Sequence, residues 1–62
     1  MTGQLRDLAL LEGHRVSIAL TDGSRIDDCQ LVFAGDERVW LFDNGRDTFV
    51  WASRVCDFWE SN

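Results

Sequence analysis

The segment 38–51 contains the strongest turn signal in this 62-residue chain. Two runs of β-branched and aromatic residues flank Asn44-Gly45, a dipeptide that accepts the positive φ angles of a type I′ turn. We therefore predict a β-hairpin in which Trp40 faces Phe49 across the two strands. The same register pairs Asp43 with Arg46, Leu41 with Thr48, and Val39 with Val50. A lone hairpin is only marginally stable in water, so the other residues must complete a sheet around it.

Alternating apolar residues predict a strand over residues 14–21 and a second strand after it. Between them, Asp22-Gly23 favours a tight turn. The second strand has Ile26 on its inner face and then resumes the inward pattern with Cys29, Leu31 and Phe33. Positions 26 and 29 cannot share a face of a regular strand, because side chains alternate with a period of two. We therefore predict a β-bulge near Asp27-Asp28 that bends this strand.

The two ends of the chain complete the predicted fold. Residues 1–13 form an amphipathic helix in this prediction, with Thr2 as cap, one apolar stripe (Leu5, Leu8 and Leu11) and Gly13 at its end. Such a helix either plugs one end of a barrel or docks to a partner. Ala52-Ser53 is a short break, one 3₁₀ turn in length, before a last strand over 54–60. The prediction is a single mainly-β domain: a small five-stranded bent antiparallel barrel over 14–60 with a short N-terminal helix.

The charge balance bears on the kind of partner. Eleven acidic residues stand against six basic ones, giving a net charge of −5, and every basic residue is arginine. Nucleic-acid-binding modules normally present a basic face, because phosphate neutralisation supplies most of their affinity. An acidic domain attracts basic partners by long-range steering. We expect a basic protein partner before a nucleic acid.

A chain of this size buries a small core and usually needs a disulfide, a metal or a second copy to stabilise it. Cys29 and Cys56 are interpreted as small buried apolar residues, and only His14 is a further good zinc ligand. No metal or cofactor is expected. There is no apolar run of membrane-spanning length, and the first residues lack the basic region of a signal peptide, so we expect a cytoplasmic protein without a membrane partner.

Residues 11–23, which read Leu-Glu-Gly-His-Arg-Val-Ser-Ile-Ala-Leu-Thr-Asp-Gly, resemble the first motif of the Sm-like proteins. Residues 48–55 are similar to the junction of the fourth and fifth strands in that family. The order of elements also resembles that of Sm-like and SH3-like small barrels. The resemblance implies assembly into a dimer or ring through the edge strands, here by the last strand, whose apolar residues include Val55, Phe58 and Trp59.

The turns that bind RNA in Sm-like proteins differ in this chain. The family has an Asn after an aromatic residue in one turn and an Arg-Gly pair in the other, where this chain has residues 35–37 and 52–54. Of these residues, the resemblance implies an equivalent role for Arg54 alone, and RNA binding is not carried over. Two alternatives stay open. A ring could gather arginines into a basic patch (Arg38, Arg46 and Arg54) that contacts RNA or DNA. An acidic barrel could instead occupy the nucleic-acid site of a basic partner; the small inhibitor of the Rho termination factor has a similar fold.

The hairpin carries aromatic residues on one face (Trp40, Phe42, Phe49 and Trp51) and smaller apolar residues on the other (Val39, Leu41 and Val50). Three interpretations remain open for the aromatic residues. They are the core, or a subunit interface, or a binding platform together with Arg54. A platform would cage a cationic side chain, as Tudor-like barrels do, with Asp43 and Asp47 adding charge. It could instead stack nucleic-acid bases, with Arg38, Arg46 and Arg54 as the phosphate track.

No catalytic constellation is evident in the sequence. The acid pairs Asp27-Asp28 and Asp36-Glu37 lie in or near turns, and neighbouring strand residues point to opposite faces, so we interpret them as solvated charge. His14 has no motif partner, no serine lies in a nucleophile elbow, and there is no glycine-rich phosphate loop. We expect a non-catalytic, regulatory protein-interaction module that self-associates.

Overall fold

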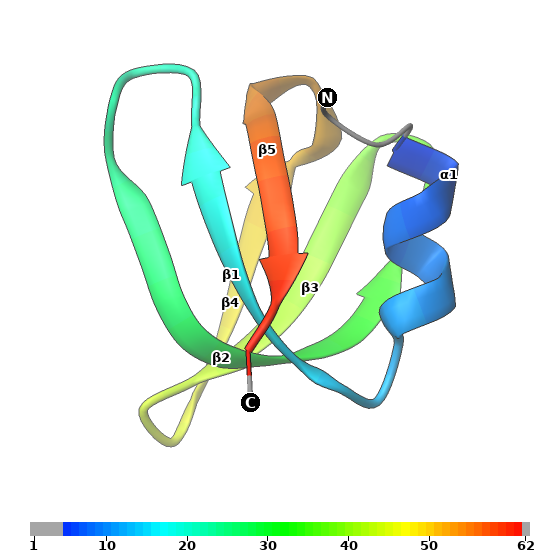
Figure 1. The fold of residues 1–62 in the computed structure, drawn as a ribbon, viewed down its shortest axis with the longest axis vertical. Coiled ribbons are helices and arrows are strands. Elements are labelled where there is room, and N and C mark those ends of the chain that lie inside the picture. The colour runs from blue at the N-terminus through cyan, green and yellow to red at the C-terminus, as the bar shows by residue number, and fades with distance from the viewer. Residues whose placement is uncertain (1–4, 62) are drawn as a thin grey trace.

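The computed structural model describes residues 5–61 as one antiparallel sheet preceded by a short helix (Figure 1). Its elements are α1 (Leu5–Leu8), η1 (Ala9–Leu11), β1 (Arg15–Leu20), β2 (Arg25–Ala34), β3 (Arg38–Asp43), β4 (Arg46–Trp51), η2 (Ala52–Arg54) and β5 (Val55–Glu60). The five strands are ordered β4-β3-β2-β1-β5. The prediction of a mainly-β fold with five antiparallel strands is confirmed, including the 3₁₀ turn at Ala52.

The predicted closure into a barrel is wrong. Long β2 curls strongly and bends the sheet (Figure 1), but β4 and β5 form its two ends and do not pair with each other. Short η2 joins them instead. The amide of Ala52 donates to the Glu37 carbonyl at 2.7 Å, and the Arg54 carbonyl accepts from the Thr21 amide at 2.8 Å. In residues 5–61, β4 and β5 are therefore connected through η2, and neither has another strand paired along its outer edge.

Within the described residues, the N-terminal helix is one α-helical turn followed by one 3₁₀ turn. Four residues form α1 and three more form η1, and the predicted cap at Thr2 lies outside the described residues. Leu8 is fully buried in the core, and Leu11 packs against it. Gly13 adopts a φ of +88°, the left-handed conformation expected at the end of the helix. Among the described residues, no helix has the length and apolar character needed to cross a bilayer.

The predicted bulge in β2 is confirmed. Val16 pairs with Cys29 and Ile18 with Ile26, so β2 has one residue more than β1 between these pairs. The extra length is taken up at Asp28, which has a φ of +54°. Both Ile18 and Cys29 thereby point into the core.

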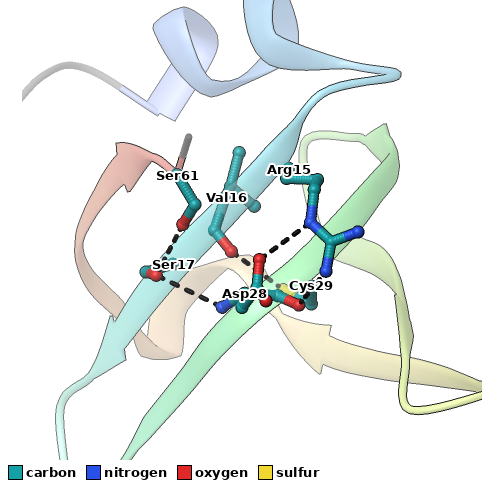
Figure 2. A network of polar contacts seen from close by, with 6 residues as sticks. All are labelled: Arg15, Val16, Ser17, Asp28, Cys29 and Ser61. Carbon is teal, nitrogen blue, oxygen red and sulfur yellow. Dashed lines mark hydrogen bonds and ion pairs between the residues drawn. The ribbon is translucent and has the colours of Figure 1, made fainter.

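Polar contacts hold this bulge in place (Figure 2). The Arg15 guanidinium donates to the Asp28 carboxylate at 2.8 Å, and the Asp28 amide donates to the Ser17 hydroxyl at 3.3 Å. That hydroxyl also bonds to the Ser61 hydroxyl at 2.9 Å, beyond the end of β5. The hydrogen bond from Arg15, together with its positive charge, lowers the pKa of Asp28, although both side chains are exposed. The network therefore links β1, β2 and the C-terminal end of β5.

A second bulge in β2 was not predicted. Leu31 pairs with Leu41 and Phe33 with Trp40, so β2 has one residue more than β3 at Val32. The bulge reverses the faces beyond it. Phe33, predicted to point inward, is 55% exposed, and Ala34 packs against the core instead. The prediction that Phe33 points inward is wrong, because it assumes regular alternation of side chains past Val32, where the bulge interrupts that alternation.

The hairpin has the predicted register, including the pairs Trp40–Phe49 and Asp43–Arg46. Asn44 and Gly45 have φ angles of +52° and +81°, as a type I′ turn requires. The smaller apolar side chains are the ones that face inward: Val39 and Leu41 are fully buried. The buried core consists of Leu8, Val16, Ile18, Cys29, Leu31, Val39, Leu41 and Ala52. The interpretation of the hairpin aromatics as the core is therefore wrong.

The two cysteines have different environments. Cys29 is buried, its thiol donates to the Val16 carbonyl with the atoms 3.4 Å apart, and burial raises its pKa. Cys56 is exposed, so its predicted burial is wrong. It lies at a register shift where Ala19 pairs with Asp57 but Leu20 pairs with Val55. Neither cysteine is in a disulfide.

Candidate binding surface on the aromatic side of the sheet

Large apolar side chains are exposed together on the outer side of β2, β3 and β4. The register places Phe33 beside Trp40, Trp40 beside Phe49, and Arg38 beside Trp51. We name the aromatic face by its five exposed rings: Phe33, Trp40, Phe42, Phe49 and Trp51. The exposed fraction is 36% for Trp40 and 58% for both Phe49 and Trp51. Four of these five rings are the binding residues expected from the sequence, and the second bulge adds Phe33.

Trp40 and Phe49 form the centre of this face. Their ring centroids are 5.5 Å apart and their planes meet at 26°, so the rings stack. The indole nitrogen of Trp40 donates to an oxygen of Asp47 at 3.0 Å. The hydrogen bond and the stack both restrict the orientation of the Trp40 ring. The outer surface at the centre of the hairpin is therefore an ordered aromatic platform.

A groove of about 370 Å³ lies between this platform and the turn that joins β2 to β3. Its apolar walls are the rings of Phe33, Trp40 and Phe49, and the turn residues 35–38 form the rest. We call it the acidic groove, after Asp36 and Glu37. A cavity of this size is within the range that binds side chains and small ligands.

Gly35 lets the turn approach the aromatic face. A Cβ atom added at this position would lie 2.9 Å from Cε2 of Phe33, closer than carbon atoms approach without displacement. The turn is also fixed by its backbone, since the Gly35 amide donates to the Arg38 carbonyl at 3.0 Å. The absence of a side chain at Gly35 therefore lets the Phe33 ring form one wall of the acidic groove.

The charge around the groove is negative. Asp36 and Glu37 line it together with Arg38, and Asp47 is held against Trp40. Three carboxylates and one guanidinium therefore lie in or next to the groove. Asp36 and Glu37 were interpreted from the sequence as solvated charge, and both are exposed, but they are positioned beside aromatic rings.

Arg54, the remaining binding residue expected from the sequence, lies elsewhere. Its guanidinium donates to the Asp22 carboxylate at 2.9 Å. The Ser24 hydroxyl and amide also donate to this carboxylate, at 2.6 and 2.9 Å, and these bonds lower the pKa of Asp22 more than Arg54 does. Arg54 therefore fastens η2 to the turn between β1 and β2.

The residues expected at an oligomer edge divide between two environments. Val55 and Phe58 are half-buried and pack against the core. Trp59 is 40% exposed, and the Arg25 guanidinium lies 5.4 Å from the centre of its ring. Arg25 also forms an ion pair with Asp27 at 2.8 Å. The outer backbone edge of β5 and the ring of Trp59 are both accessible to a second molecule.

The structure does not bring together the residues considered for metal binding or acid–base chemistry. His14 lies 3.1 Å from Glu60, whereas Asp27 and Asp28 are held by different arginines. In residues 5–61, no group of three or more histidine, cysteine or acidic side chains is arranged to hold a metal ion.

No protein-family model matches the chain, and no curated protein matches it either. The aromatic face and the acidic groove are therefore the features that indicate a function.

Proposed function

We propose that this domain is a non-catalytic protein-interaction module that binds its partner on the aromatic face. The observation that carries the proposal is the cluster of five exposed aromatic rings on one side of the sheet. Contiguous exposed apolar surface on a small protein is typical of an interaction site. Tryptophan and other aromatic side chains dominate the binding energy of protein interfaces. The stacked pair at the centre of the face is held in place before any partner arrives.

The charges favour a basic protein over a nucleic acid as that partner. The chain has a net charge of −5. In the described part of the chain, Arg15, Arg25 and Arg54 are each engaged by an aspartate. Arginines neutralised in this way contribute little to a phosphate track, on which nucleic-acid affinity mainly depends. The acidic groove, next to the aromatic rings, is complementary to a basic segment.

We also propose that the domain self-associates as a dimer or ring through β4 and β5. These strands are the two ends of the sheet and have unpaired outer edges. Such edges favour pairing with another strand. Sm-like proteins, which the sequence pattern resembles, assemble by pairing the fourth strand of one subunit with the fifth of the next. Analytical ultracentrifugation tests this, and a folded monomer at high micromolar concentration would contradict it.

The partner proposal is tested by capture with the full chain from native lysate, with and without nuclease, followed by purification of the captured protein. The test variant is Phe42→Thr/Trp51→Thr, which removes two exposed rings and keeps β-branched residues in the strands. The matched control is Leu10→Gln, because Leu10 is 76% exposed but lies outside the aromatic face. We expect direct binding of the purified basic protein by the native chain and the control, and at least tenfold weaker binding by the test variant.

Two results would contradict this proposal. Equal binding by the test variant would place the interaction elsewhere on the molecule. Loss of every captured protein after nuclease treatment would mean that a nucleic acid forms the bridge, which is the Sm-like RNA- or DNA-associated alternative.

A further inference from the structure

We propose that the acidic groove binds an arginine side chain of the partner protein, with its guanidinium stacked on the Trp40–Phe49 pair and facing the carboxylates of Asp36 and Glu37. This inference rests on the proposed function and names the chemistry that the partner must present. It is carried by three observations: the shape of the aromatic pair, the charge of the groove, and a similar arrangement elsewhere in the same chain.

The shape of the aromatic pair selects a flat cation. The rings of Trp40 and Phe49 stack with their planes only 26° apart, so each ring covers one face of the other and leaves its opposite face as a flat surface. An aromatic cage for a rounded ammonium group needs rings that face it from several directions. A planar guanidinium instead stacks on one aromatic surface and donates hydrogen bonds from its edge. The geometry therefore favours arginine over lysine.

The charge of the groove supplies the hydrogen-bond acceptors. Asp36 and Glu37 are exposed and line the groove together with the rings of Trp40 and Phe49. Carboxylates accept paired hydrogen bonds from a guanidinium in a geometry that an ammonium cannot reproduce. Asp47 accepts the indole N–H of Trp40, and this charge-assisted bond increases the electron density of the ring that receives the cation. Arg38 opposes binding with one positive charge, so the groove stays negative overall.

The same chain contains this combination on β2 and β5. The Arg25 guanidinium lies 5.4 Å from the ring centre of Trp59 and pairs with Asp27 at 2.8 Å. At this exposed site, one arginine therefore contacts a tryptophan ring and pairs with an aspartate at the same time. The acidic groove likewise has a tryptophan ring beside carboxylates, and an arginine of the partner would take the place that Arg25 has on β2.

The test is an NMR titration of the full, ¹⁵N-labelled chain with three short peptides. They are acetyl-Gly-Arg-Gly-amide, its lysine counterpart, and its citrulline counterpart, which keeps the planar shape without the charge. We expect the arginine peptide to shift the Trp40 indole signal and the amides of Gly35 and Glu37 saturably. Citrulline should bind about fivefold more weakly, the factor of an exposed cation–π contact, and lysine should fall between the two.

Variants locate the site. Asp36→Asn/Glu37→Gln should weaken binding of the arginine peptide about fivefold. The control Asp57→Asn/Glu60→Gln removes the same charge from β5 and keeps hydrogen-bond acceptors for the Phe58 amide and His14. This control should bind within about twofold of the native chain if the effect is local rather than due to net charge.

The results separate this inference from the proposed function. Equal affinity for arginine and citrulline, with shifts confined to the aromatic face, would reject cation recognition and leave the interaction surface in place. Equal weakening by both double variants, shifts away from the groove, or no saturable binding would also overturn the inference. Whether the partner needs the aromatic face is decided separately by the Phe42→Thr/Trp51→Thr capture experiment.

Discussion

Trp40 stacks on Phe49 on the solvent side of the β3–β4 ladder, with 5.5 Å between ring centroids, while the next residue, Leu41, is fully buried on the other side. The larger rings are therefore outside and the smaller aliphatic side chains inside. A sheet of six-residue strands around a bulged β2 encloses little volume. Leu41 lies opposite Leu31 at its centre, and both are fully buried.

The buried position of Leu41 predicts a large loss of stability on truncation. Leu41→Ala should lower the free energy of unfolding by about 2–5 kcal/mol, because it removes buried methyl groups and leaves a cavity. Urea denaturation followed by circular dichroism measures this loss. The matched control is Phe42→Thr on the same strand, because Phe42 is exposed. A larger loss for Phe42→Thr than for Leu41→Ala would contradict the assignment of faces.

Local patterns in the sequence predicted the turns and the first bulge. Asn44-Gly45 determined the hairpin register, and the spacing of Ile26 and Cys29 required an extra residue between them. The bulge at Val32 does not disturb the apolar spacing in the sequence, because Leu31 and Phe33 are two residues apart, as in a regular strand. That is why Phe33 and the groove beside it were not found.

Hydrophobicity alone did not distinguish the two faces of the hairpin. Both faces carry apolar residues, so periodicity identifies the strands but not the inner side. Packing between strands determines which face is buried, since Leu41 lies opposite Leu31. Closure was overestimated for a related reason, since predicted bending of β2 does not determine whether the distant strands β4 and β5 pair.

The hairpin turn makes its own prediction. Gly45 has a φ of +81°, and a Cβ atom added there would meet no atom within 4 Å, so substitution is opposed by backbone conformation rather than by contact. Gly45→Ala should destabilise the protein by about 1 kcal/mol or more. Thermal unfolding measures the effect. Asn44→Gly is the control, because glycine also accepts the φ of +52° there and should cost less. Equal stability of Gly45→Ala and the native chain would argue against the type I′ turn.

The Arg15–Asp28 pair should make stability depend on pH in the acidic range. The pKa of Asp28 is lower in the folded protein than its ordinary value of about 4. The pair therefore stabilises the fold above about pH 4, and this contribution is lost as the pH falls through the folded pKa. Asp28→Asn, which tolerates the positive φ, should flatten the pH dependence of unfolding between about pH 2 and 5.

A double-mutant cycle checks the cause of this effect. Arg15→Gln should flatten the curve in the same way, and the double variant should add little, because both changes remove one interaction. Fully additive effects of the two changes would show that Arg15 and Asp28 act independently.

The two thiols should react at different rates. Cys56 is exposed, whereas Cys29 is buried and has a raised pKa. At about pH 8, Ellman's reagent should modify Cys56 quickly and Cys29 only when the protein unfolds, because thiolate is the reactive form. In Cys56→Ser, the rapid phase should disappear while the slow phase remains. Two rapid thiols in the folded native chain would contradict the burial of Cys29.

The most direct test of the account is urea denaturation of the variant Trp40→Thr/Trp51→Thr, followed by far-ultraviolet circular dichroism. Both rings are on the aromatic face, and threonine keeps the β-branched preference of the strands. We predict a folded protein whose free energy of unfolding falls by no more than about 2 kcal/mol, mainly from the lost stack on Phe49. An unfolded variant, or a loss of about 3–5 kcal/mol for each tryptophan, is the result for core residues and would contradict the aromatic face as a binding surface.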